Sequence, residues 1–283
     1  MKPWVLTALL SAFFWALSDA LAKKSMQEEG TGVLQVLWLR FLIGAPVVFP
    51  ILFWTGIPRW TPEFLRLHLL WIPLETVAII LYLTAIRISP LSLTLPYLAL
   101  TPVFLTVTGR MLLQEQVNAL GFLGILLVVL GAFVLQSERP HPIAWLRAFF
   151  RKKGPPLMVL VALIYAFTSI FGKQLIRETS PAYFTVHYMG MMALATAPLG
   201  LRDRHRGRPG RYLVLAGIST ALSALFHMIA ISQAIVAYMI ALKRTSGVFG
   251  VLLGAWMFRE RALRRRLTGA SLMLVGAWVL SRL

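Results

Sequence analysis

Apolar residues in this chain form long uninterrupted runs, each about the length of a membrane span. A helix needs about 20 predominantly apolar residues to cross a hydrocarbon core about 30 Å thick. The runs lack the strict alternation of apolar and polar positions that marks barrel strands. The pattern therefore predicts an all-α polytopic membrane protein with ten transmembrane helices. We place the spans at residues 4–22, 33–54, 64–88, 90–110, 118–136, 156–177, 181–201, 211–232, 235–257 and 266–282.

The second half of the chain repeats the spacing of the first. Thr84–Leu135 overlays Ile229–Leu280 without a gap, with Glu115 over Glu260 and with glycines matched as well. Each half then holds five spans, and an odd number means that the second copy enters the membrane from the opposite side. The sequence therefore predicts two inverted five-helix repeats, at residues 1–137 and 156–283, an arrangement found in many secondary transporters.

Charge is sparse and lies mostly outside the spans. Only 13% of the residues are charged, yet the formal net charge is +18. Most of the Lys and Arg residues follow spans one, three, five, seven and nine, as the positive-inside rule requires of cytoplasmic loops. The basic loop Arg202–Arg211 therefore does not indicate a nucleic-acid partner. The same rule places both termini outside the cytoplasm, and the basic, amphipathic linker 138–155 is expected to lie on the lipid surface.

The chain resembles the EamA type of the drug/metabolite transporter superfamily over nearly its whole length. The resemblance is carried by the five plus five spans and by "WALSDALAK" and "YAFTSIFGK", which end spans one and six with a lysine. It also includes "LRF" at Leu39–Phe41, a glutamate after the fourth span of each repeat and then glycines spaced by seven. Span seven departs from the pattern, with "VHYMG" where a second "RF" is expected. The resemblance implies a transporter, and it implies cytoplasmic termini, the opposite of the charge count.

Charged residues inside the predicted spans are the candidates for chemistry, because a charge in hydrocarbon is costly and usually functional. Glu75 lies about 16 Å into span three, and Arg40 lies inside span two. Lys243 and Arg244 lie about 12–14 Å into span nine. One carboxylate facing two or three cations favours a substrate with an anionic group, and arginine binds carboxylates and phosphates with two hydrogen bonds. The alternative is a structural ion pair, in which Glu75 neutralises one of the cations without touching a substrate.

Other polar and helix-breaking residues complete the predicted site. Tyr82 and Tyr97 are expected to line it. Pro102 and Gly247 occupy matching positions of spans four and nine, and paired interruptions of that kind point to a transporter site.

Proton chemistry has one candidate. Glu75 could load and release a proton, unless a neighbouring cation holds it ionised. His187 and His227 are expected to form hydrogen bonds between helices, and Asp19 is expected to pair with Lys23 one helical turn away.

Enzyme signatures are missing from the chain. It has no cysteine, no zinc-binding histidine spacing and no complete P-loop, so we expect no enzyme, cofactor or metal site. We predict a secondary active exporter of a small metabolite with an anionic group, an amino acid or organic acid, in the inner membrane, with protons as the candidate coupling ion. The alternatives are a carrier of a phosphorylated or lipid-linked substrate and a non-transporting membrane scaffold or sensor. A cationic-drug exporter is disfavoured because its site should carry surplus negative charge.

Overall fold

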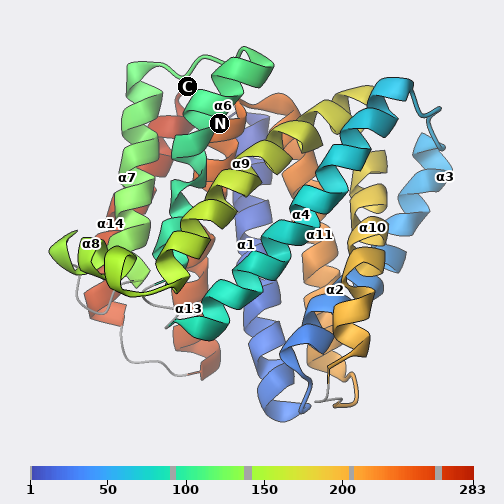
Figure 1. Cartoon of the computed structure of the whole chain (residues 1–283), viewed down its shortest axis with the longest axis horizontal. Helices are drawn as coiled ribbons and strands as arrows, with labels where there is room; N and C mark the ends of the chain where they lie inside the picture. The colour runs from blue at the N-terminus through green and yellow to red at the C-terminus, as the bar shows by residue number, and fades with distance from the viewer. Residues whose placement is uncertain (1, 90–93, 137–141, 204–206, 259–262) are drawn as a thin grey trace.

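In the part of the chain that the structure describes, the elements group into ten helical segments, as the apolar runs predict. Figure 1 shows the helices running back and forth through one bundle. The computed structural model describes residues 2–89, 94–136, 142–203, 207–258 and 263–283. The segments are α1 (Pro3–Glu28), α2 (Val33–Val48) continued by η1 (Phe49–Ile51) and α3 (Leu52–Thr55), α4 (Pro62–Ile88), η2 (Leu95–Leu100) continued by α6 (Thr101–Leu113), α7 (Ala119–Gln136), α9 (Gly154–Glu178), α10 (Pro181–Leu201), α11 (Arg211–Gln233), α12 (Val236–Lys243) continued by α13 (Ser246–Phe258), and α14 (Leu263–Ser281).

The segments have the length and composition of membrane spans. Within the described residues, seven are long and apolar enough to cross a membrane, and the apolar parts of α7 and α14 are shorter. The remaining segment, α10, has 21 residues. The number and order of the predicted spans are therefore confirmed, with ends that differ by a few residues.

Both termini lie at one end of the bundle, which we call the terminus end (Figure 1). There the Lys2 amine donates a hydrogen bond to the carbonyl of Leu283. The opposite end, which we call the basic end, carries the loop at 29–32 and residues 202–203 and 207–210. Five segments in each half give the second half the opposite direction through the membrane, so the predicted inverted repeat is confirmed.

Glycines of the two repeats bring equivalent helices into backbone contact. The last segment of each repeat, α7 and α14, pack against each other. A side chain on Gly131 would lie 2.7 Å from the carbonyl oxygen of Gly269, and one on Gly276 would lie 2.7 Å from that of Gly124. Gly124 and Gly131 align with Gly269 and Gly276 in the repeat, so the two contacts are related by the near two-fold axis of the fold. Small residues at such positions allow membrane helices to approach closely.

A second pair of equivalent contacts is not symmetric. The α2 and α11 helices meet backbone to backbone, because a side chain on Gly44 would lie 2.7 Å from the carbonyl oxygen of Gly217. The equivalent helices α10 and α4 have far fewer backbone approaches. Aromatic and histidine side chains fill the contact between them instead, near the terminus end. The two repeats thus differ in how closely their second and third spans pack.

Carboxylates cap helices at the basic end. Glu29, after α1, accepts hydrogen bonds from the Ser25 hydroxyl (2.7 Å) and the Tyr212 amide (2.8 Å), and from two more amides at the start of α11. Partial burial opposes ionisation, but these hydrogen bonds together lower the pKa of Glu29 below its ordinary value. Asp203 likewise accepts from the Leu34 amide (2.9 Å) at the start of α2. An acidic group at a helix N-terminus satisfies free amides and favours the helix dipole.

The linker between the repeats forms the short helix α8 (Pro142–Arg151), seen at the lower left of Figure 1. Leu146 and Phe150 are exposed, and Phe149 contacts the ring of Tyr97. Exposed apolar rings beside Arg151 fit a helix lying at the membrane surface. Residues 138–141 of the predicted linker lie outside the described part of the chain.

Candidate functional site

The ninth span is broken where its two cations lie. Helix α12 ends at Lys243, and α13 begins after Arg244 and Thr245. At the break the Thr245 hydroxyl donates to the carbonyl oxygen of Leu242 (2.7 Å), and the Gly247 amide donates to that of Arg244 (3.1 Å). These short-range bonds satisfy polar groups freed by the interruption. The break places a cationic pair at the C-terminal end of α12, the end that favours positive charge.

The first repeat is interrupted at the matching position. The 3₁₀ turn η2 gives way to α6 at Thr101, and Thr101 aligns with Ser246, where α13 begins. Pro102 follows in the first turn of α6, where a residue without an amide hydrogen is tolerated. Gly247 lies in the first turn of α13. Two half-helices therefore start at equivalent points of the two repeats.

Lys243 and Arg244 have different partners. The Arg244 guanidinium donates to the Thr101 hydroxyl on α6 (3.0 Å), which links the two interrupted spans. The Lys243 amine lies 3.2 Å from Nδ1 of His227 on α11 and 4.9 Å from the ring centre of Trp15. Adjacent residues of a helix point about 100° apart, which accounts for the divergence. The predicted bonding of His227 between helices is confirmed.

Arg40 forms the ion pair of the site. Its guanidinium lies 3.3 Å from the carboxylate of Asp19 on α1 and 5.2 Å from the ring centre of Trp15. The expected pair of Asp19 with Lys23 is wrong, because Asp19 is turned toward α2. The Asp19 side chain is 55% exposed although it lies well inside α1, so its carboxylate faces open space between the helices.

Glu75 lies about halfway along α4, which has 27 residues. The Thr168 hydroxyl on α9 lies near its carboxylate, and Lys243 acts on it through space. Among the described residues Glu75 forms no close ion pair, since the pairs found there involve other carboxylates. The structural ion-pair alternative, in which Glu75 neutralises one of the cations, has no close contact to support it among these residues. The carboxylate is near the cations without being neutralised by direct contact.

Tyrosines connect these charges into one set, which we call the polar cluster. Tyr82 lies near Asp19, Arg40 and Arg244, and Tyr165 and Tyr188 lie near Glu75. The polar cluster comprises Asp19, Arg40, Glu75, Tyr82, Tyr165, Tyr188, His227, Lys243 and Arg244. Its members come from α1, α2, α4, α9, α10, α11 and the break after α12.

Tyr97 does not join the polar cluster. It is buried in η2, and its ring centre lies 5.2 Å from that of Phe133 and 6.1 Å from that of Phe149. The ring therefore packs toward α7 and α8, and a place for Tyr97 in the substrate site stays a prediction.

The polar cluster carries three cations and two carboxylates, so one positive charge remains when all are ionised. The Nε atoms of Arg40 and Arg244 are buried and have no hydrogen-bond partner in the described part of the chain. Leaving a buried donor unpaired costs about 1–3 kcal/mol, and more for a charged group. A carboxylate or phosphate bound there would satisfy such donors, and arginine has the geometry for it.

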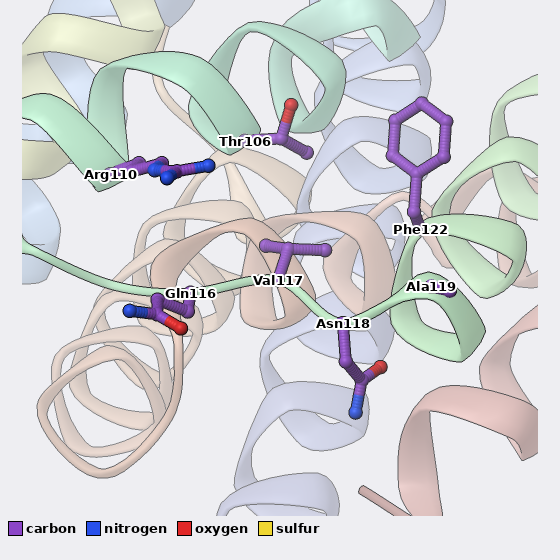
Figure 2. A pocket seen from close by; sticks show the side chains of 7 residues that line it. All are labelled: Thr106, Arg110, Gln116, Val117, Asn118, Ala119 and Phe122. Atoms are coloured by element: carbon purple, nitrogen blue, oxygen red, sulfur yellow. The ribbon is translucent and has the colours of Figure 1, made fainter.

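Two hollows lie apart from the polar cluster. The first, of about 280 Å³, is formed by the end of α6 and the following loop; Figure 2 shows Arg110 and Thr106 on one side of it and Asn118 and Phe122 on the other. The second, of about 560 Å³, is an apolar groove between α2 and α10. None of the residues predicted for the site lines either one.

The arrangement can be set beside known proteins. A family model described as "EamA-like transporter family" matches residues 2–137 and 152–282. The chain belongs to the EamA-like transporter family. The two matched stretches correspond to the two repeats, and the family makes this EamA-like chain a membrane transporter of the drug/metabolite superfamily.

A solved structure described only as "Crystal structure of protein" is similar to this EamA-like chain, with a TM-score of 0.76 and 17% identity. The aligned region covers 98% of this chain and 95% of the chain in the solved structure. The likeness is one of fold. No curated protein matches the sequence.

Sequence reasoning assigned Asp19 to a neighbour on its own helix and His227 to a bond between helices, so it placed neither in the site. Trp15, whose ring contacts Arg40 and Lys243, was not considered. A signal was present: Trp15 and Asp19 both lie in the segment that repeats at the end of span six, so the segment marked a functional region as well as the duplication. Glu260, the counterpart of Glu115, lies outside the described residues.

Proposed function

We propose that this EamA-like chain exports a small metabolite with an anionic group, an amino acid or an organic acid, by alternating access. One observation carries the proposal: three cations converge at the polar cluster, and two of their guanidinium nitrogens have no hydrogen-bond partner among the residues the structure describes. Binding near the midplane, where half-helices meet between inverted repeats, is the arrangement expected of a secondary transporter. We place the chain in the inner membrane with its basic end in the cytoplasm, as the distribution of Lys and Arg favours.

The carboxylates of the polar cluster favour an amino acid over a simple acid. Asp19 is exposed toward the interior, and the Trp15 ring lies beside it on the same helix. A substrate ammonium group suits both, since aromatic faces and carboxylates attract cations. The substrate carboxylate would then take the free donors of Arg40 and Arg244. A zwitterion fits this distribution of charge better than a dicarboxylate does.

Glu75 is the proposed proton site, and its coupling depends on the substrate. A substrate ammonium group competes with a proton for the carboxylates, which gives exchange of substrate against protons. A simple organic acid has no such group. Protonation of Glu75 would then make the polar cluster more positive and favour binding of the anion. The anion and the proton would therefore cross the membrane in the same direction.

Counterflow in proteoliposomes tests the proposal. The probes are the proteinogenic L-amino acids, small mono- and dicarboxylic acids and glycerol 3-phosphate, each labelled inside or outside. We expect saturable exchange of at least one amino acid or organic acid. Arg244→Ala or Lys243→Ala should weaken it about tenfold or more, because a charge-assisted hydrogen bond contributes about 1.5–3 kcal/mol. Arg66→Ala is the matched control, since Arg66 is 72% exposed and pairs with Glu63.

Full exchange in both variants would show that Lys243 and Arg244 do not bind the substrate. If wild type exchanges none of the probes, the transport proposal is refuted in favour of a scaffold. Loss of folding in the variants, seen by size-exclusion chromatography, would favour the structural ion-pair alternative.

A phosphorylated or lipid-linked substrate is the second candidate, because the apolar groove between α2 and α10 begins at Leu42, two residues beyond Arg40. A polar head at Arg40 and an apolar chain in the groove would suit such a substrate. Exchange of glycerol 3-phosphate alone would favour this reading.

A further inference from the structure

A pair of histidines lies outside the polar cluster, between the two repeats. Nε2 of His187 on α10 lies 3.2 Å from Nδ1 of His68 on α4. Both are the seventh residue of their helix, so each lies about 9 Å from the terminus end at 1.5 Å per residue. The predicted role of His187 as a hydrogen bonder between helices is confirmed, but its partner is a second imidazole.

The pair lies in the contact that side chains alone make between α4 and α10. Aromatic rings enclose it, with ring centres 5.7–6.1 Å from one or both imidazoles. These rings belong to Trp60, Phe64, Trp71, Tyr183 and Phe184. Trp60 also donates a hydrogen bond to the Tyr183 hydroxyl (2.9 Å), which holds the enclosure together.

The pair is aligned with Glu75. His68, Glu75 and Tyr82 follow one another at intervals of seven residues and therefore share one face of α4. Glu75 lies about 10 Å further along the helix than His68. Trp71, beside His68, also contacts Tyr188 of the polar cluster, with ring centres 5.9 Å apart. The pair thus lies between the terminus end and the central carboxylate.

Other charged groups near this end are engaged elsewhere. Glu63 and Arg66 pair with each other on the exposed start of α4. On α9, Glu178 accepts a hydrogen bond from Thr61, and Lys173 is bound by Glu115. Besides Glu75, the helices around the pair carry further titratable groups: Tyr82, Arg87, Tyr165, Arg177, Tyr183, Arg40, Tyr188, Arg211, Tyr212 and His227. Segments η1 and α3 contribute none. The neighbouring imidazole is the group that acts on His187 through space.

We propose that His68 and His187 relay protons between the terminus end and Glu75; this rests on the proposed proton-coupled function. In the neutral pair one ring donates across the 3.2 Å contact and the other accepts. A proton binds the free outer nitrogen of the donor ring, the bridging proton moves to the acceptor ring, and the outer N–H of that ring releases its proton. One proton enters and one leaves, and both rings are neutral again. Rotation or proton exchange of the rings resets the relay.

The test follows protonation of Glu75 and needs no substrate. Wild type, His68→Gln and His187→Gln are reconstituted in vesicles in which a cleavable C-terminal tag faces outward. In these vesicles the terminus end also faces outward, so an acid jump in the external buffer reaches it. The infrared carbonyl band that is absent from Glu75→Gln reports protonation of this residue. Glutamine can keep a hydrogen bond across the contact but cannot relay a proton. We expect the band to rise roughly tenfold or more slowly in both variants. Tyr183→Phe, which changes the enclosure but no imidazole, should match wild type.

Unchanged rates in the variants, or no band that Glu75→Gln removes, would overturn the relay. Counterflow of the amino-acid and organic-acid probes should persist in both histidine variants, because exchange needs no net proton movement. If no probe exchanges in wild type, the proposed function fails while the infrared rates still decide the relay.

Discussion

The buried ion pair between Lys173 and Glu115 permits a quantitative prediction. The Lys173 amine lies 2.5 Å from the Glu115 carboxylate and 2.6 Å from the carbonyl oxygen of Ala234. The other carboxylate oxygen accepts the Val236 amide (2.8 Å), the first of α12. The side chains are only 6% and 10% exposed. One ion pair therefore joins the loop after α6, helix α9 and the start of the broken ninth span.

Glu115→Ala should be strongly destabilising. It leaves the Lys173 charge buried with one carbonyl for a partner, and breaking a buried pair from one side costs about 3–5 kcal/mol. The apparent melting temperature should then fall by on the order of 10 °C. Lys173→Met should cost less, because Glu115 keeps the Val236 amide. The double variant should be more stable than Glu115→Ala alone, since no uncompensated charge remains.

Thermal unfolding in nanodiscs, followed by the fluorescence of the nine tryptophans, measures these shifts. Glu63→Ala is the matched control, because its pair with Arg66 is solvent-exposed and such pairs contribute about 0–1 kcal/mol. Equal shifts for Glu115→Ala and Glu63→Ala would refute the reasoning. Strictly additive shifts in the double variant would show that the two side chains do not depend on each other.

Three further predictions concern packing, pH and orientation. Gly131→Ala should lower the melting temperature, since overpacking costs about 1–3 kcal/mol. Gly250→Ala should not, because its added methyl meets no atom within 4 Å. Equal effects of the two substitutions would contradict the α7–α14 contact. Because the pKa of Glu29 is lowered in the fold, its ionised carboxylate stabilises the fold at pH values above its ordinary pKa. This stabilisation should be lost as the pH falls through the lower pKa of the folded state. Glu29→Gln should lose that part of the acid dependence in pH-resolved melting, and an unchanged profile would remove its capping role. Arg208→Cys, in a chain without cysteine, should resist impermeant thiol reagents added outside cells, and outside labelling would place the termini in the cytoplasm.

The fold was largely predictable because its determinants are local in the sequence. Span length and apolar composition follow from the thickness of the bilayer, and the duplication is visible as matched residues. The contacts between the copies were not visible. Glycines at 124, 131, 269 and 276 align in pairs, but the alignment does not say that Gly131 meets Gly269 rather than Gly276. That choice depends on the inverted direction of α14 and on packing across the two-fold axis.

The position of each site residue along its helix was predictable, but the direction in which its side chain points was not. Counting residues along spans put Arg40, Glu75 and Lys243 inside predicted spans, and they lie in the helices α2, α4 and α12. It could not give the rotation of each helix about its axis, which tertiary packing sets. Asp19 was therefore paired along its own helix when it faces Arg40, and Tyr97 was assigned to the site although its ring packs toward α7 and α8.

The asymmetry between the repeats indicates what the other state of the transport cycle looks like. At the basic end α2 and α11 meet at Gly44 and Gly217, whereas their equivalents α10 and α4 are held apart by rings at the terminus end. Because the repeats are related by a near two-fold axis, exchanging their packing gives an alternative in which α2 and α11 separate. A disulfide between one cysteine on α2 and one on α11, at positions that flank the Gly44–Gly217 contact, should then block counterflow, and a reducing agent should restore it. Each single variant is the control, and continued exchange with the cross-link formed would show that the basic end opens elsewhere.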